Sequence, residues 1–151
     1  MRIFLLDSLT CRQATDCSVL PSNDECANAT VISTLPYFDT NTTGNRLAGF
    51  DEAQSCSFVN SNTRGVWYTL VGDGLCYNAS TSGTLNLDTT LSVYTGESGC
   101  QDLACFAEND DGGSNLTSLV SWETEPGVSY YILVAALGSQ AGPYQLSVDV
   151  S

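Results

Sequence analysis

The stretch Tyr144-Gln-Leu-Ser-Val-Asp-Val150 alternates apolar and polar side chains with a period of two residues. Its apolar members stand at positions 144, 146, 148 and 150, and Gln, Ser and Asp stand between them. A period of two is typical of a β-strand that buries one face and exposes the other to water. The stretch therefore predicts a strand in an antiparallel sheet with one solvated face.

The rest of the chain follows the same pattern. Clusters of Gly, Asn, Asp, Ser and Pro separate short runs rich in β-branched and aromatic residues, and no 11-residue window keeps an apolar 3.6-residue period. Strands are predicted at residues 30–33, 65–70, 84–87, 90–94, 103–107, 118–122, 129–137 and 144–150. With no helices to cover a parallel sheet, the predicted fold is all-β: a two-sheet antiparallel β-sandwich, jelly-roll-like, with an N-terminal extension.

The 151 residues suffice for one domain with one core. Leu20-Pro-Ser-Asn23 is typical of a linker, which predicts an arm and linker at residues 1–22 and the sandwich module at 23–151. The arm holds a short apolar run made of Ile3, Phe4, Leu5 and Leu6. This run is shorter than a signal peptide core or a membrane span requires, so we expect no membrane insertion.

The apolar run of the arm needs a surface that buries it, because each large apolar side chain gains roughly 1.5 to 3 kcal/mol on burial. We expect residues 1–10 to add as a β-strand to the sheet of a neighbouring subunit, which would produce a homo-oligomer or an open filament. The alternative is an extra edge strand within the arm's own domain.

The charge balance excludes several function classes. The chain has 17 acidic residues against four arginines, with no lysine and no histidine, for a formal net charge of −13. It therefore lacks the residues for histidine-based catalysis, imidazole metal sites and Schiff-base chemistry. Binding to nucleic acid needs clustered cations, which are absent from this sequence. We expect a protein that is not an enzyme and does not bind nucleic acid.

Cysteines and glycosylation sequons point to an oxidising compartment. Seven cysteines occur without a Cys-x-x-Cys pair, which favours a disulfide framework over a zinc site. Four Asn-x-Ser/Thr sequons begin at Asn28, Asn41, Asn78 and Asn115. The sequence predicts a secreted glycoprotein with N-linked glycans at two or more of these sites. Asn41 and Asn115 are the first choices because both lie in runs of small polar residues.

One acidic stretch, Glu108-Asn-Asp-Asp-Gly-Gly113, could bind an ion. Calcium prefers six to eight hard oxygen ligands, and Asn109, Asp110 and Asp111 would supply several, with Asp88 added from a nearby strand. The alternative is a hairpin turn in which Asn and Asp cap their own backbone. We expect no cofactor, with calcium at this stretch as the alternative.

Five aromatic residues stand at or near alternating strand positions: Trp67, Trp122, Tyr130, Tyr131 and Tyr144. Such residues usually fill the core or pair across strands. The alternative is a stacking platform for sugar rings.

Several blocks of the sequence together resemble a known kind of module. They are Asn23-Asp-Glu-Cys-Ala-Asn-Ala-Thr30, Gly65-Val-Trp-Tyr-Thr69, Asp88-Thr-Thr-Leu-Ser-Val-Tyr-Thr-Gly96, Leu103-Ala-Cys105, Asn109-Asp-Asp111, Gly127-Val-Ser-Tyr-Tyr-Ile-Leu-Val134 and Gly142-Pro-Tyr-Gln-Leu-Ser-Val148. In this order they resemble secreted β-sandwich modules that open with Asn-Asp-Glu-Cys, among them the bacterial pre-peptidase C-terminal (PPC) domain and CUB-like sandwiches. The resemblance implies an extracellular, non-catalytic module that is appended to or repeated in surface and adhesive proteins.

The resemblance also implies the disulfides Cys26–Cys56 and Cys100–Cys105. Cys11, Cys17 and Cys76 then remain, and an odd count leaves a free thiol or a bond between subunits. The alternative is a local Cys11–Cys17 bond with Cys76 as a buried thiol. The expected function is a structural or adhesive subunit of a surface assembly or filament. The competing hypotheses are a carbohydrate-binding module and an appended domain of a secreted hydrolase.

Overall fold

A computed structural model describes residues 20–41, 44–46, 48–49, 51, 53, 56–60 and 62–151. These residues form nine strands and two short 3-10 helices. The strands are β1 (Thr30–Val31), β2 (Tyr37–Asn41), β3 (Gly65–Val71), β4 (Cys76–Ser80), β5 (Thr89–Thr95), β6 (Ala104–Asn109), β7 (Leu119–Glu123), β8 (Ser129–Ala136) and β9 (Tyr144–Val150). The 3-10 helices are η1 (Cys26–Asn28) and η2 (Gly99–Gln101).

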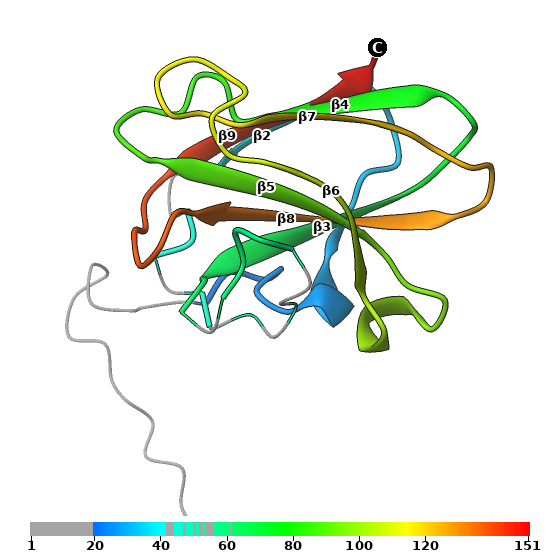
Figure 1. The fold of residues 1–151 in the computed structure, drawn as a ribbon, viewed down its shortest axis with the longest axis horizontal. Coiled ribbons are helices and arrows are strands. Elements are labelled where there is room, and N and C mark those ends of the chain that lie inside the picture. Colours follow the sequence, from blue (N-terminus) through cyan, green and yellow to red (C-terminus); the bar gives the residue numbers. More distant parts are fainter. Residues whose placement is uncertain are drawn as a thin grey trace, which may run out of the picture.

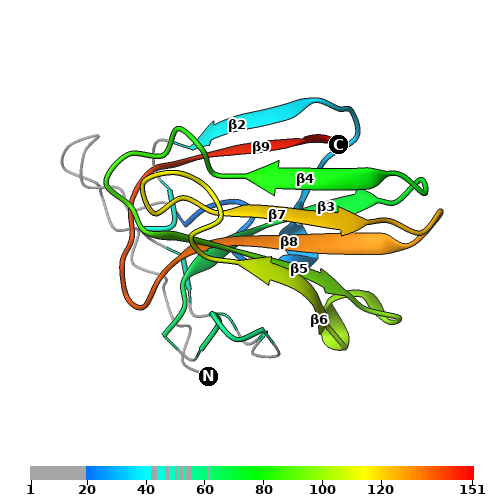
Figure 2. The ribbon, with the colours of Figure 1, turned by 45° about the horizontal axis from the view of Figure 1, so that its top comes forward.

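The strands form two sheets that pack face to face (Figure 1). One sheet has the order β1-β3-β8-β5-β6 and the other β2-β9-β4-β7, and Figure 2 shows β2, β9, β4 and β7 following one another from the top of the view. All pairs are antiparallel except β1 with β3, which is parallel. The predicted all-β sandwich is therefore confirmed. Among the described residues, no helix has the length and apolarity to cross a membrane.

Side chains from both sheets fill the space between them. Strand β9 buries Tyr144, Leu146 and Val148 and exposes Gln145 and Asp149, as its alternation predicts. Val150, at the end of the strand, is 39% exposed and lies outside the core.

A second apolar cluster covers the outer face of the five-stranded sheet. Cys56 and Val59, from the connection between β2 and β3, pack there with Trp67, Tyr94 and Leu133. As a result, β3 and β8 are buried on both faces over most of their length. This burial explains why the two strands are nearly continuous in apolar and aromatic residues.

Two strands were not predicted. Strand β2 places Asp39 on its inward side, and β4 buries only Tyr77 and Ala79 among polar neighbours. Conversely, residues 84–87 do not form the predicted strand. Asn86 has a φ of +58°, which interrupts extended backbone there.

Polar groups inside the sandwich join β2 to the core. The Tyr68 hydroxyl donates to Asp39 Oδ2 at 2.5 Å and also hydrogen-bonds the Tyr144 hydroxyl, to which Asn41 Nδ2 donates at 3.2 Å. Burial raises the pKa of both tyrosines, so their hydroxyls stay protonated. A buried polar network stabilises the fold only when all its donors and acceptors are hydrogen-bonded. Because Asp39 and Asn41 belong to this network, it specifies the position of β2.

Candidate functional site

Two disulfides attach the segments that cover the outer face of the five-stranded sheet. Cys26 bonds to Cys100 with a Cα–Cα distance of 5.8 Å, and Cys56 bonds to Cys105 with a Cα–Cα distance of 5.1 Å. The four cysteines were expected to be oxidised, but the predicted pairing, Cys26–Cys56 and Cys100–Cys105, is wrong. Cys100 belongs to η2 and meets η1, whereas Cys105 belongs to β6 and meets the β2–β3 connection. Each bond therefore joins segments that only the folded chain brings together.

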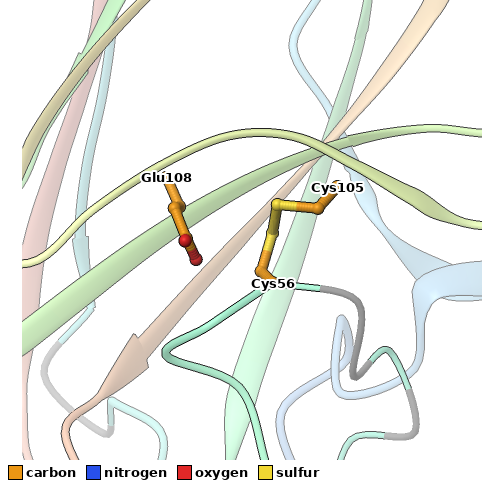
Figure 3. A group of neighbouring side chains, drawn as sticks. All are labelled: Cys56, Cys105 and Glu108. Atoms are coloured by element: carbon orange, nitrogen blue, oxygen red, sulfur yellow. A yellow bond between two sulfur atoms is a disulfide. The ribbon is translucent and has the colours of Figure 1, made fainter.

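Glu108 reinforces the second disulfide (Figure 3). Its Oε2 accepts hydrogen bonds from the backbone N–H of Ser57 at 2.7 Å and of Phe58 at 3.4 Å. The carboxylate and the Cys56–Cys105 bond thus attach the same turn to β6. Because the two sulfurs are bonded to each other, the three neighbouring side chains do not form a metal site.

Cys76 fits one of the two expectations for it. It is the first residue of β4 and its side chain is exposed, so the alternative of a buried thiol is wrong and the expectation of a free thiol is kept. Cys11, Cys17 and the apolar run Ile3, Phe4, Leu5 and Leu6 lie outside the described residues.

Three of the four predicted calcium ligands come together. Asp88, Asp110 and Asp111 each place a carboxylate oxygen within 4.8 Å of the others, and we call these three residues the acidic cluster. Asn109 is not part of it, because its Oδ1 accepts from the N–H of Gly112 at 2.6 Å and of Leu119 at 3.1 Å. The turn alternative is wrong in one respect, since the loop joins β6 to β7 across the two sheets.

The acidic cluster contains unsatisfied polar atoms. Oδ1 of Asp88 and Oδ1 of Asp110 are buried without a hydrogen-bond partner in the described part of the chain. Burial, followed by the Asp111 charge, raises the pKa of each of these carboxyls. Because a hard cation would satisfy both oxygens and neutralise the repulsion, the donor set fits calcium.

The four sequons lie in different surroundings. Asn28 ends η1 and Asn115 lies in the β6–β7 loop, and both are exposed. Asn78 is half-buried in the middle of β4, where its Oδ1 accepts from the Ser121 hydroxyl at 2.6 Å. The Asn41 amide donates to Tyr144, and its Oδ1 accepts from Gly44 N at 2.8 Å. Both polar atoms of the Asn41 side chain are therefore hydrogen-bonded within the fold.

Most of the aromatic residues belong to the core. Trp67, Trp122, Tyr130 and Tyr144 are at most 5% exposed, and Tyr131 is half-buried. Trp122 and Tyr130 pack with ring centroids 6.4 Å apart. Four of the five candidate residues for a sugar platform are therefore not accessible to a ligand.

A buried carboxylate, Asp51, was missed from the sequence. Its two oxygens accept from Gly65 N and Trp67 Nε1, both at 2.8 Å. Burial, opposed by these two hydrogen bonds and reinforced by Asp24 and Glu25, raises the pKa of Asp51 to about 6. The residue lies in a polar stretch of sequence with no periodic pattern, so no local signal marks its burial.

Two grooves lie next to each other at one end of the five-stranded sheet. The first, about 630 Å³, is apolar and is lined by Ala29, Val31, Val71, Tyr131 and the Cys26–Cys100 bond. We call the second the carboxylate groove. It measures about 510 Å³ and is lined by Glu97, Phe106, Glu125 and Tyr131 among others.

Comparison with known proteins supports the fold. No family model matches the chain, and no curated protein matches its sequence. Among solved structures, the pre-peptidase C-terminal domain of a collagenase from Bacillus anthracis, a 1.0 Å crystal structure, is similar with a TM-score of 0.51. The identity is 20%, and the match covers 80% of this chain and 94% of that domain. The chain therefore has a PPC-like β-sandwich fold, which confirms the predicted resemblance at the level of fold.

Proposed function

We propose that this chain is a non-catalytic extracellular module of structural or adhesive type that joins other copies of itself through its arm, residues 1–22. The two disulfides support an oxidising compartment. The PPC-like fold supports a module rather than a complete enzyme. The exposed, unbonded Cys76 supplies a thiol for a bond between subunits.

The observation that carries the assembly proposal is the presence of open strand edges. In the described part of the chain, β1, β6, β2 and β7 each pair with a strand on one side only. An open edge accepts an added strand through main-chain hydrogen bonds. The apolar run of the arm would gain burial in such a contact.

Electron microscopy and sedimentation of the full chain test the proposal. We expect the wild-type protein to form oligomers or filaments, and a full-length variant with serine at positions 3–6 to remain monomeric with an unchanged circular dichroism spectrum. A deletion of residues 1–22 that folds should behave in the same way. An arm variant that still assembles, or a wild-type protein that is monomeric at all concentrations, would contradict the proposal.

A second candidate function is an appended domain of a secreted hydrolase. The similarity to a domain of a collagenase favours it. In that case the wild-type protein should be monomeric, and the arm substitutions should leave its sedimentation unchanged. The same experiment therefore separates the two candidates.

Glycosylation follows from the positions of the sequons. We expect N-linked glycans at Asn28 and Asn115, which are exposed, and none at Asn41, whose amide hydrogen-bonds within the fold. Glycopeptide mapping of the protein from a eukaryotic secretory host measures the occupancy of each site. A bare polypeptide mass, or full occupancy at Asn41, would contradict this prediction.

Calcium at the acidic cluster is a further part of the proposal. We expect millimolar calcium to raise the free energy of unfolding by about 1 to 3 kcal/mol, as binding to the folded state alone requires. Asp110→Asn should abolish the gain, because it removes a ligand with a buried oxygen. Asp149→Asn, at an exposed position on β9, is the matched control. Equal calcium responses in the two variants, or no response in the wild type, would show that the cluster does not bind the ion.

A further inference from the structure

The charge of this chain is unevenly distributed along the sequence. The arm, residues 1–22, contains Arg2 and Arg12 against Asp7 and Asp16 and so has no net charge, whereas residues 23–151 carry the whole net charge of −13. The arm places Arg2 directly before its apolar run, and the module to which the arm is attached is strongly acidic. Opposite charge steers an association and selects its site more than it adds affinity.

The carboxylate groove combines an exposed apolar surface, which the apolar run of the arm requires, with carboxylates that can pair with an arginine. Phe106 is 49% exposed there, and Glu97 and Glu125 are exposed carboxylates. Arg46 and Arg64, the cations of the described residues, do not line this groove. The neighbouring apolar groove is lined by no charged residue, so it has no carboxylate to pair with an arginine.

The open edge of β6 forms part of this groove. Val93 pairs with Ala107 and Tyr94 with Cys105, which leaves Phe106 as the extra residue of a β-bulge. A bulge re-aims the side chain that it carries. The Phe106 ring packs edge-on against Tyr130, with centroids 5.4 Å apart, while half of its surface stays open to solvent.

We propose that the carboxylate groove is the receptor for the arm of a second copy of this chain. The apolar run at residues 3–6 covers Phe106 and Tyr131, and the Arg2 guanidinium lies between Glu97 and Glu125. This inference rests on the proposed function, since it names the surface that the exchanged arm occupies. Each copy offers one arm and one groove, so the contact is head-to-tail and continues from copy to copy.

Charge reversal in the full chain tests the pairing. We expect Arg2→Glu, and separately the double variant Glu97→Arg with Glu125→Arg, to require roughly tenfold higher protein concentration for assembly. Combining the three substitutions should restore assembly toward the wild-type concentration. Glu123→Arg reverses one charge at an exposed position on β7, outside the groove, and should have little effect.

The outcomes separate this inference from the function on which it rests. If serine at positions 3–6 abolishes assembly but the groove variants assemble like the wild type, the arm binds elsewhere and the inference is wrong. If the combination of all three reversals does not restore assembly, Arg2 does not face this groove and the inference also fails. If the reversals change the stability of a monomer without affecting assembly, the arm docks on its own domain and the inference is wrong. If the serine variant assembles normally, the proposed function itself is wrong.

Discussion

Replacing both Cys56 and Cys105 with alanine is expected to lower the free energy of unfolding by about 4 kcal/mol. The bond closes a loop with a sequence separation of 49 residues, and a loop of that length loses about this much conformational freedom in the unfolded chain. Its loss also frees the β2–β3 connection from β6. Val59 and its partners Trp67 and Leu133 would then lose part of their cover.

Chemical denaturation of the variant and of the wild type measures this difference. Cys26→Ala with Cys100→Ala should cost a similar amount, because that bond spans 74 residues. Cys76→Ser is the control and should change the stability little, since its side chain is exposed and unbonded. Peptide mapping without reduction should recover the peptide that contains Cys26 bonded to the peptide that contains Cys100, and likewise the Cys56 and Cys105 peptides bonded to each other. A Cys26 peptide bonded to a Cys56 peptide would refute this arrangement.

Acidification from pH 7.5 to about pH 4 is expected to stabilise the domain, with Asp51 contributing about 2.5 kcal/mol over this interval. Its pKa is about 6 in the folded protein, against an ordinary aspartate value of 3.8 in the unfolded chain. A carboxyl with a raised folded pKa holds its proton more tightly in the folded state. Its contribution to stability is therefore complete below pH 3.8 and is lost as the pH rises through 6. The raised pKa values of Asp88 and Asp110 act in the same direction.

Thermal unfolding at a series of pH values measures this effect. Asp51→Asn should flatten the dependence between pH 4 and 7.5, because the amide does not titrate. The groups that face Asp51 are Asp24 and Glu25, whose negative charges both raise its pKa. Asp149→Asn, at an exposed position, should keep the wild-type profile. If the stability of Asp51→Asn depends on pH as steeply as that of the wild type, groups other than Asp51 cause the pH dependence.

The sheet architecture followed from short-range patterns. The alternation in β9 placed Tyr144, Leu146 and Val148 on the inner face, since side chains of a strand point to opposite sides in turn. Strand β4 was missed because Asn78 and Ser80 are typical of turns, and only burial of Tyr77 and Ala79 makes the segment a strand. Propensity is local, whereas β4 exists as a strand through its pairing with β7 and β9, which lie far along the chain.

The sequence identified most residues of the candidate acidic site, but it did not determine which of them contact one another. Asp88, Asp110 and Asp111 were expected to approach one another and do so, whereas Asn109 turned to the backbone of its own loop. The Phe106 bulge had no counterpart in the sequence pattern. A bulge depends on the register between β5 and β6, which residue types alone do not specify.

By itself the sequence determined that this protein is an all-β sandwich with an acidic surface and several oxidised cysteines, because residue periodicity, composition and cysteine number are properties of the chain. Only the tertiary structure decided which cysteines meet, that Asp51 of the β2–β3 connection is buried, and that Cys76 is exposed. These features depend on distances between segments that are up to 74 residues apart in sequence. Such distances are set by the packing of the two sheets and their cover, and no local pattern of residues encodes them.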